Sequence, residues 1–243
     1  MLTVERLAWD SDFFGFTVGR LSGQVTAGDD LAQALTRGVA DGIRLTYGHC
    51  KHGDEAAAAS CLLQGGRRVD TKCTYVLLLA GLSAPPAAPE PDRALASHPC
   101  DRRRVRSLAW KSAQYSRFRV DPDMPARAWR RLYTAWAHNS LNGQFADAVL
   151  VERRHGGVVG MVSVSVRQGR GSIGLLAVDT HHRGQGLGQR LLEAACRYCI
   201  SAGCGTLEVV TQGDNLAACG LYERAGYALA DAQAVFHFWT PRP

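Results

Sequence analysis

The chain has 243 residues, of which 46% are apolar and 21% are charged, with 26 Gly and 9 Pro. These values are ordinary for a soluble globular protein and exclude a disordered, collagen-like or low-complexity chain. The start of the chain lacks the cationic and apolar blocks of a signal peptide, and the longest apolar stretch, residues 75–80, is far shorter than the roughly 20 residues of a membrane-spanning helix. We therefore expect a cytoplasmic protein with no membrane partner.

The formal net charge is +6, and the positive charge is concentrated in one segment. Residues 101–131 contain ten Arg or Lys and three Asp, which leaves the rest of the chain close to neutral. Such a cluster is typical either of a site for a phosphorylated ligand or of a solvated helix face. It is accompanied by no zinc finger, helix-turn-helix or aromatic-interleaved pattern, so we expect no nucleic-acid partner.

Apolar periodicity and turn-forming residues predict an alternation of strands and helices along the chain. In chain order, the expected strands are 17–21, 72–79, 148–152, 158–166, 172–178, 206–211 and 235–239, and the expected helices are 31–39, 105–114, 125–138, 187–202 and 216–225. This order predicts an α/β (α+β) fold, with a mixed, mostly antiparallel central sheet flanked by helices.

Four prolines in residues 83–92 exclude a helix interior or a central strand there. We predict a linker over residues 83–99, between a smaller N-terminal α/β domain of residues 1–82 and a C-terminal domain of residues 100–243.

Eight cysteines without a secretory signal indicate a reducing compartment rather than disulfides. Cys196 and Cys199 form the only close pair, and both lie on or near the apolar stripe of the helix predicted over 187–202. This placement favours small core side chains over a zinc or redox site. We expect no metal.

A glycine-rich turn, HHRGQGLG at residues 181–188, joins a predicted strand to a predicted helix. Gly184, Gly186 and Gly188 let the backbone approach a ligand, and the free N–H groups and positive dipole end of the helix favour an anion. Arg183 adds a cation at the same place. Because the turn lacks both the acidic residue of a dinucleotide site and the Gly-Lys-Ser/Thr of a P-loop, the sequence predicts a pyrophosphate-bearing ligand other than NAD or ATP.

The segment RGQGLG at residues 183–188 resembles the Arg/Gln-x-x-Gly-x-Gly/Ala motif of the GCN5-related N-acetyltransferases (GNAT). The strand ending LAV at residue 178 precedes it, and Asn215 and the segment GLYERAGY at 220–227 follow, in the order typical of that family. The resemblance implies a GNAT-type sheet and acetyl-CoA as the donor cosubstrate. The implied acetyl-CoA-binding residues are Leu176, Ala177, Val178, Arg183, Gly184, Gln185, Gly186, Leu187, Gly188 and Asn215.

The same resemblance implies that Tyr222 is the general acid. Tyr222 follows Asn215 by seven residues, so on one helix the two would lie on the same face, two turns apart. A phenol, with an ordinary pKa of about 10, can donate a proton to a thiolate, whose conjugate thiol has a pKa of about 8.5. A backbone N–H of Ala177 or Val178 would stabilise the oxyanion as the amine attacks the thioester directly.

The general base is not evident in the sequence. The strand predicted over 158–166 offers only Ser163 and Ser165 as polar side chains. We therefore expect a water relay, with His181 and His182 as further candidates beside the glycine-rich turn.

A narrower resemblance extends over most of the chain. Residues 7–15 (LAWDSDFFG) and 113–119 (AQYSRFR) are similar to segments of the dTDP-fucosamine acetyltransferase family. Members of that family acetylate the 4-amino group of a dTDP-linked 4-amino-4,6-dideoxygalactose, a step of polysaccharide biosynthesis, and dimers are common among them. The resemblance implies a nucleotide-linked amino sugar as substrate, a possible homodimer, and substrate contacts from Ser116, Arg117, Phe118 and Arg119. The sugar diphosphate would give the basic segment a role.

Two further hypotheses remain open. One is a GNAT enzyme that acetylates another amine, such as an aminoglycoside, a polyamine or a protein N-terminus; the basic segment disfavours the polycations by like-charge repulsion. The other is a CoA-binding module without turnover, which the presence of Asn215 and Tyr222 disfavours.

Overall fold

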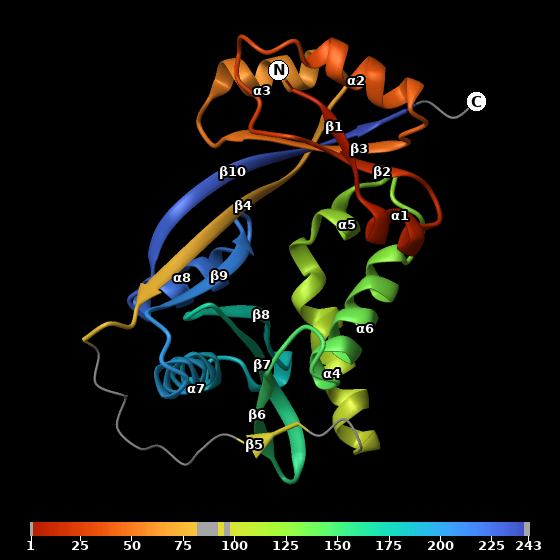
Figure 1. Ribbon diagram of the computed structural model, residues 1–243. Coiled ribbons are helices and arrows are strands. Elements are labelled where there is room, and N and C mark those ends of the chain that lie inside the picture. Colours follow the sequence, from red (N-terminus) through yellow and green to blue (C-terminus); the bar gives the residue numbers. More distant parts are fainter. Residues whose placement is uncertain (1, 82–91, 95–97, 241–243) are drawn as a thin grey trace.

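One mixed sheet of ten strands runs through the part of the chain that the computed structural model describes, residues 2–81, 92–94 and 98–240 (Figure 1). Its strand order is β1-β2-β3-β10-β4-β9-β8-β7-β6-β5. The strands are β1 (Val4–Arg6), β2 (Val18–Leu21), β3 (Leu45–Lys51), β4 (Arg67–Leu78), β5 (Asp92–Arg93), β6 (Ala148–Arg154), β7 (Gly157–Arg167), β8 (Arg170–Val178), β9 (Thr206–Gln212) and β10 (Ala228–Trp239). Neighbours are antiparallel except for the parallel pairs β2/β3 and β8/β9, which confirms the expected fold class.

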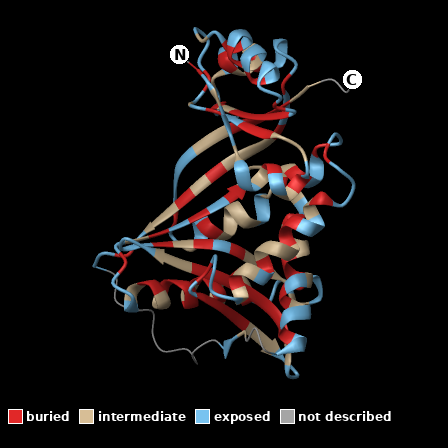
Figure 2. Cartoon of the chain, turned by 45° about the vertical axis from the view of Figure 1, so that its right-hand side comes forward, coloured by how far each residue is buried: buried red, intermediate tan, exposed pale blue. Residues whose placement is uncertain are grey.

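Helices cover both faces of this sheet. They are α1 (Ala8–Phe14), α2 (Leu31–Ala40), α3 (Glu55–Leu63), α4 (Pro99–Ser112), α5 (Arg117–Val120), α6 (Ala128–Leu141), α7 (Leu187–Ser201) and α8 (Leu216–Arg224), with short 3-10 turns at Ala113–Tyr115 and Thr180–His182. One core cluster joins α4 and α6 to one face of β6–β8, and a second joins α7 and α8 to the other face. A third lies under α2 and α3, at the end of the sheet formed by β1–β3 and β10 (Figures 1 and 2).

The segment before the predicted linker contributes a strand to the middle of the sheet. β4 lies between β10 and β9 and is antiparallel to both. The sheet therefore joins segments on both sides of the predicted domain boundary, and the division into domains 1–82 and 100–243 stays a prediction. Most of the predicted linker, residues 83–91 and 95–97, lies outside the described residues.

Local sequence signals place the helices of the second half well. α7 buries Leu187, Leu191 and Cys199 along one stripe, and the chain turns away at Gly203, with φ of 74°. Asn215 caps α8 by accepting a hydrogen bond from the backbone N–H of Ala218, which satisfies one free donor of the first turn.

Several elements were not predicted: β1, α1, β3, α3, β5 (which lies within the predicted linker), α5 and the first half of β10. The segment 228–234 is rich in alanine, a residue depleted in strands, yet it is extended because β4 pairs with it along its length and β3 pairs with its last residues. Here the strand ladder overrides local propensity.

All eight cysteines are free thiols, and Cys196 and Cys199 are buried on α7. Within the described residues, no group of three or more His, Cys, Asp or Glu side chains is arranged to hold a metal ion. Among the same residues, no helix has the length and apolar composition needed to cross a bilayer.

A close approach between α7 and β8 gives a test of this packing. A Cβ atom on Gly171 of β8 would overlap the Sγ atom of Cys199 and lie 3.1 Å from Leu207 Cδ1. We expect Gly171→Ala to push α7 outward and to lower the free energy of unfolding by about 1–3 kcal/mol, as overpacking does. Thermal unfolding followed by circular dichroism measures the effect. Gly205→Ala is the control, because nothing lies within 4 Å of its Cβ position; equal melting temperatures for the two variants would contradict the prediction.

Candidate active site

A bulge in β8 opens the centre of the sheet. Pairing with β7 shifts by one residue between Ile173 and Leu175, so Gly174 is the extra residue. Ser163 of β7 supports the bulge, because its hydroxyl accepts a hydrogen bond from the backbone N–H of Leu175 at 2.8 Å. Bulges bend a strand and disrupt the ladder locally. β8 pairs with β9 only as far as Ile173, and beyond the bulge a gap separates the two parallel strands.

Two cavities meet at this gap. The loop cavity, of about 650 Å³, lies beside the glycine-rich turn and is lined by Leu176, Ala177 and Val178. The aromatic cavity, of about 640 Å³, lies on the side of α6 and has Phe118, Tyr133 and Trp136 in its wall. Both cavities are lined by Ser112, Leu176, Asn215 and Ala218. A ligand in one cavity can therefore reach a ligand in the other through the gap.

The glycine-rich turn presents its backbone to the loop cavity. Gly184 and Gly186 adopt left-handed conformations, with φ of 75° and 72°, and Gly186 caps the N-terminus of α7. A Cβ on Gly188 would lie 3.1 Å from Leu221 Cδ2, so a side chain there would crowd α8. Free N–H groups at the start of a 15-residue helix are a site for phosphate.

Most of the residues expected to bind acetyl-CoA line the loop cavity. They are Leu176, Ala177, Val178, Arg183, Gly184, Gly186, Leu187, Gly188 and Asn215. Gln185 is not among the lining residues, and its carbonyl accepts a hydrogen bond from Arg190. The Arg183 Nε donates to the carbonyl of Val178 at 3.4 Å, which folds the side chain back along the turn.

A buried aspartate anchors this turn to α4. Asp179 accepts hydrogen bonds from Lys111 Nζ at 2.9 Å, from the backbone N–H of His181 at 3.1 Å and from Arg104 at 3.4 Å. The bond from Lys111, with the His181 N–H and the Arg104 charge, lowers the pKa of the Asp179 carboxyl to about 2 despite its burial. His182 lines the loop cavity and His181 is exposed, so both lie near the glycine-rich turn and neither lines the aromatic cavity.

Tyr222 of α8 lies in the wall of the aromatic cavity, beside the gap. Its side chain is 4% exposed and packs between the rings of Tyr75 and Tyr227, with centroid distances of 5.7 and 5.8 Å. Tyr75 donates its hydroxyl to Glu223, whereas Tyr222 lines the aromatic cavity. Burial raises the pKa of the Tyr222 phenol well above its ordinary value, so the group is protonated at neutral pH.

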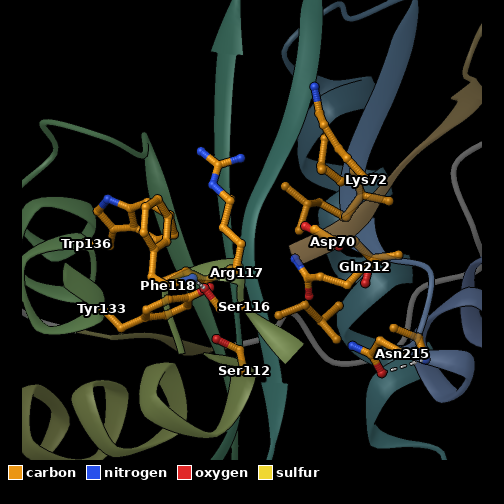
Figure 3. Close-up of a pocket in the computed structure, with 18 of the residues that line it drawn as sticks. Asp70, Lys72, Ser112, Ser116, Arg117, Phe118, Tyr133, Trp136, Gln212 and Asn215 are labelled. Carbon is orange, nitrogen blue, oxygen red and sulfur yellow. Dashed lines mark hydrogen bonds between the residues drawn. The ribbon is translucent and has the colours of Figure 1, made fainter. Parts of the chain in front are cut away.

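Asn215 and Tyr222 both line the aromatic cavity. Asn215 is the cap of α8 rather than part of the helix, and its oxygen is used for the cap. Figure 3 shows its amide nitrogen on the side of the cavity.

Of the four residues expected to contact the acceptor, Ser116, Arg117 and Phe118 line the aromatic cavity. The Ser116 hydroxyl caps the short α5. The Arg117 guanidinium carbon lies 4.8 Å from the ring centroid of Tyr47 and 4.7 Å from that of Phe118. Its Nε atom is buried and has no hydrogen-bond partner within the described residues. Arg119 points away, with its guanidinium 4.7 Å from the ring centroid of Trp129.

Two carboxylates that were not predicted from the sequence line the aromatic cavity, Asp10 of α1 and Asp70 of β4. Asp10 accepts a hydrogen bond from the Tyr47 hydroxyl at 3.1 Å. Burial raises the pKa of the Asp70 carboxyl to about 6, against the opposing effect of Arg117. Figure 3 places Asp70 and Gln212 on the wall opposite Tyr133 and Trp136. In the sequence, Asp70 is a single charged residue just before the strand predicted over 72–79, which is also typical of an exposed position.

The contacts of Asp179 predict a pH dependence of stability. Because its pKa in the folded state lies below the ordinary 3.8, Asp179 stabilises the fold fully above about pH 4, and this contribution is lost as the pH falls toward 2. We expect Asp179→Asn to cost about 2 kcal/mol at pH 7 and little at pH 2. Urea unfolding of both proteins across this range measures the difference. Glu5→Gln, which removes an exposed pair with Arg20, should show no such trend, and a pH-independent loss in Asp179→Asn would contradict the assignment.

Comparison with known proteins agrees with this geometry. Residues 104–227, just over half of the chain, match the model of the acetyltransferase (GNAT) family. Over 141 residues the chain is 28% identical to the spore coat polysaccharide biosynthesis protein SpsD of Bacillus subtilis, a match that covers 58% of this chain and 48% of SpsD. The chain thus spans about half the length of that relative.

Solved structures share the fold at low sequence identity. A GCN5-related N-acetyltransferase from Sphaerobacter thermophilus superposes with a TM-score of 0.66 at 17% identity, over 97% of this chain and 76% of that one. A second, from Kribbella flavida, gives a TM-score of 0.58 at 15% identity, over 99% and 91%. The family match over residues 104–227 shows that this chain belongs to the acetyltransferase (GNAT) family.

Proposed function

We propose that this protein transfers the acetyl group of acetyl-CoA to the amino group of a nucleotide-linked amino-dideoxy sugar, with a dTDP-4-amino-4,6-dideoxyhexose as the first candidate. The observation that supports this most directly is the meeting of two cavities at the gap between β8 and β9, with the Tyr222 phenol beside it. The loop cavity suits the donor and the aromatic cavity suits the acceptor.

The donor would bind through backbone groups. Amides of the turn 183–188 and of the first turn of α7 would surround the pyrophosphate, and Arg183 would add a positive charge. The edge of β8 from Leu176 to Val178 faces the gap, where no strand pairs with it in the described part of the chain. This edge would hydrogen-bond the amides of the pantetheine arm, much as a neighbouring strand does, and the side-chain NH2 of Asn215 would contact the same arm.

The acyl transfer needs no covalent enzyme intermediate. The neutral amine attacks the thioester carbonyl, and a backbone N–H of Ala177 or Val178 stabilises the oxyanion. When the C–S bond breaks, the Tyr222 hydroxyl donates its proton to the CoA thiolate. The buried environment that keeps this phenol protonated suits it for that role.

The aromatic cavity matches an acceptor with a weakly polar part and an anionic part. Aromatic side chains form one wall, which suits a deoxygenated sugar ring and a base. Lys72 and the unpartnered Nε of Arg117 supply charge and a hydrogen-bond donor for a diphosphate. The similarity to SpsD, named for spore coat polysaccharide biosynthesis, supports a sugar acceptor.

Replacement of the phenol tests the acid. We expect Tyr222→Phe to lower kcat by ~10²-fold or more with little change in the KM for acetyl-CoA, because a positioned proton donor is lost while the pocket is kept. Thiol release from acetyl-CoA measures the rate. Tyr227→Phe is the matched control, since its hydroxyl is buried in the adjacent core and lines neither cavity; unchanged turnover in Tyr222→Phe would remove the assignment.

A panel of acceptors tests the substrate. We expect turnover with dTDP-linked 4-amino-4,6-dideoxyhexoses, and less or none with UDP- and GDP-linked amino sugars, spermidine, aminoglycosides or a peptide N-terminus. Arg117→Ala should raise the KM for the dTDP sugar by ~10-fold or more, as loss of a charged hydrogen bond does, whereas Arg130→Ala, on the outer face of α6, should not. Turnover of free amines alone would favour the broader GNAT activity. A rise in melting temperature with acetyl-CoA but no turnover of any amine would favour the CoA-binding module.

A further inference from the structure

Asp70 belongs to β4 and lies beside the end of β9, on the acceptor side of the gap. β4 pairs with β9 as far as Lys72 opposite Gln212, and Asp70 lies two residues beyond, on the same side of β4 as Lys72. There the carbonyl of Thr71 accepts a hydrogen bond from the N–H of Gly213 at 2.7 Å. This contact holds β4 against the loop that leads to Asn215, a residue that lines both cavities.

The carboxylate of Asp70 faces the aromatic cavity and also a smaller cavity of about 450 Å³. The smaller cavity is lined by Arg67, Arg68 and Asp214, and it gives the carboxylate a second side that is open to water. The titratable and charged groups around Asp70 are Arg67, Arg68, Lys72, Cys73, Arg117, Tyr115, Tyr133 and Asp214, with Asp10 in the wall of the aromatic cavity. Cations and anions are thus mixed around it.

The other candidates for a base are committed elsewhere. Ser163 accepts the hydrogen bond that supports the β8 bulge, and it is buried. His181 and His182 lie at the donor side of the turn. Asp10 already accepts a hydrogen bond from Tyr47. The carboxylate of Asp70 has no such partner among its neighbours in the described residues beyond the backbone N–H of Thr71.

We propose that Asp70 is the general base of the transfer, receiving the proton that the acceptor amine loses at the gap between β8 and β9. This inference rests on the proposed acyl transfer and replaces the water relay expected from the sequence. It also gives the N-terminal segment, which contributes β4, a direct part in the chemistry.

The proton balance is complete with the groups present. The amine nitrogen forms a bond to the thioester carbon, and its proton passes to the Asp70 carboxylate. The C–S bond breaks, and the sulfur takes the Tyr222 proton. Asp70 then releases its proton to water through the smaller cavity, and Tyr222 regains one. The net reaction converts an amine and acetyl-CoA to an amide and CoA.

The acidity of Asp70 suits this role. A carboxyl with a pKa of about 6 is ionised at neutral pH and is a stronger base than an ordinary aspartate. Because the base must be ionised to act, kcat should fall as the pH drops below about 6.

Substitution of the carboxylate tests the proposal, with acetyl-CoA and dTDP-4-amino-4,6-dideoxygalactose as the probe. We expect Asp70→Asn to lower kcat by ~10²-fold or more, with little change in the KM of the amino sugar and with loss of the limb near pH 6. Asp70→Glu keeps the carboxylate and should recover part of the rate. Asp231→Asn, the same change at an exposed site opposite Thr74 on the neighbouring strand, should leave kcat and the pH profile unchanged.

A titration that needs no acceptor tests the same proposal independently. The carboxyl carbon of Asp70, assigned in the NMR spectrum by its absence from Asp70→Asn, should titrate near pH 6; titration near the ordinary value for aspartate overturns the inference.

A rise in KM alone in Asp70→Asn also overturns the inference, since the carboxylate would then only bind the ammonium. If the wild type acetylates the sugar and Asp70→Asn keeps the wild-type kcat and pH profile, the assignment of Asp70 as the general base is wrong and the proposed function stands. If the wild type acetylates no amine, the proposed function fails, and the proposed base fails with it.

Discussion

The extra residue at Gly174 is the constraint on which the site depends. A regular ladder between β8 and β9 would close the centre of the sheet, and neither cavity would reach the other. The bulge, held by the Ser163 hydroxyl, turns β8 away after Ile173 and leaves the backbone of Leu176–Val178 free toward the gap. The same bend places the turn 183–188 and the N-terminus of α7 at one mouth of the gap. A strand irregularity thus creates both the donor edge and the passage to the acceptor.

The acceptor wall is built from segments that are far apart in sequence. Asp121, after α5, accepts a hydrogen bond from Trp239 Nε1 at 2.9 Å and lies 2.6 Å from His237 Nδ1, both on β10. The His237 ring stacks on the ring of Tyr47 of β3. The Arg117 guanidinium lies over the rings of both Tyr47 and Phe118. Arg117 is therefore positioned by β3, β10 and α5 together, which explains why an arginine in a short helix is fixed against the cavity.

The two cavities use different kinds of electrostatics. At the loop cavity, backbone N–H groups and the dipole of α7 are fixed by the fold, and Asp179 forms ion pairs with Lys111 and Arg104 behind the turn. At the aromatic cavity, the charges are carried by side chains, namely Asp70, Lys72 and Arg117. Binding of a pyrophosphate at the first should depend little on pH, whereas events at the second should follow the ionisation of Asp70.

The sequence alone determined the elements whose signals are local. The glycines of the turn and the apolar period of α7 specified the turn, the helices after it and the position of Tyr222, because each depends on neighbours within one or two turns. Tertiary structure alone decided that β4 enters the sheet between β10 and β9, that Gly174 bulges, and that Asp70 faces Tyr133 and Arg117 across a cavity. Strand partners and desolvation are set by residues on other elements: β4 pairs with β9 at Cys73 and Thr211, and the bulge at Gly174 depends on Ser163 of the neighbouring strand. No pattern within one element carries them.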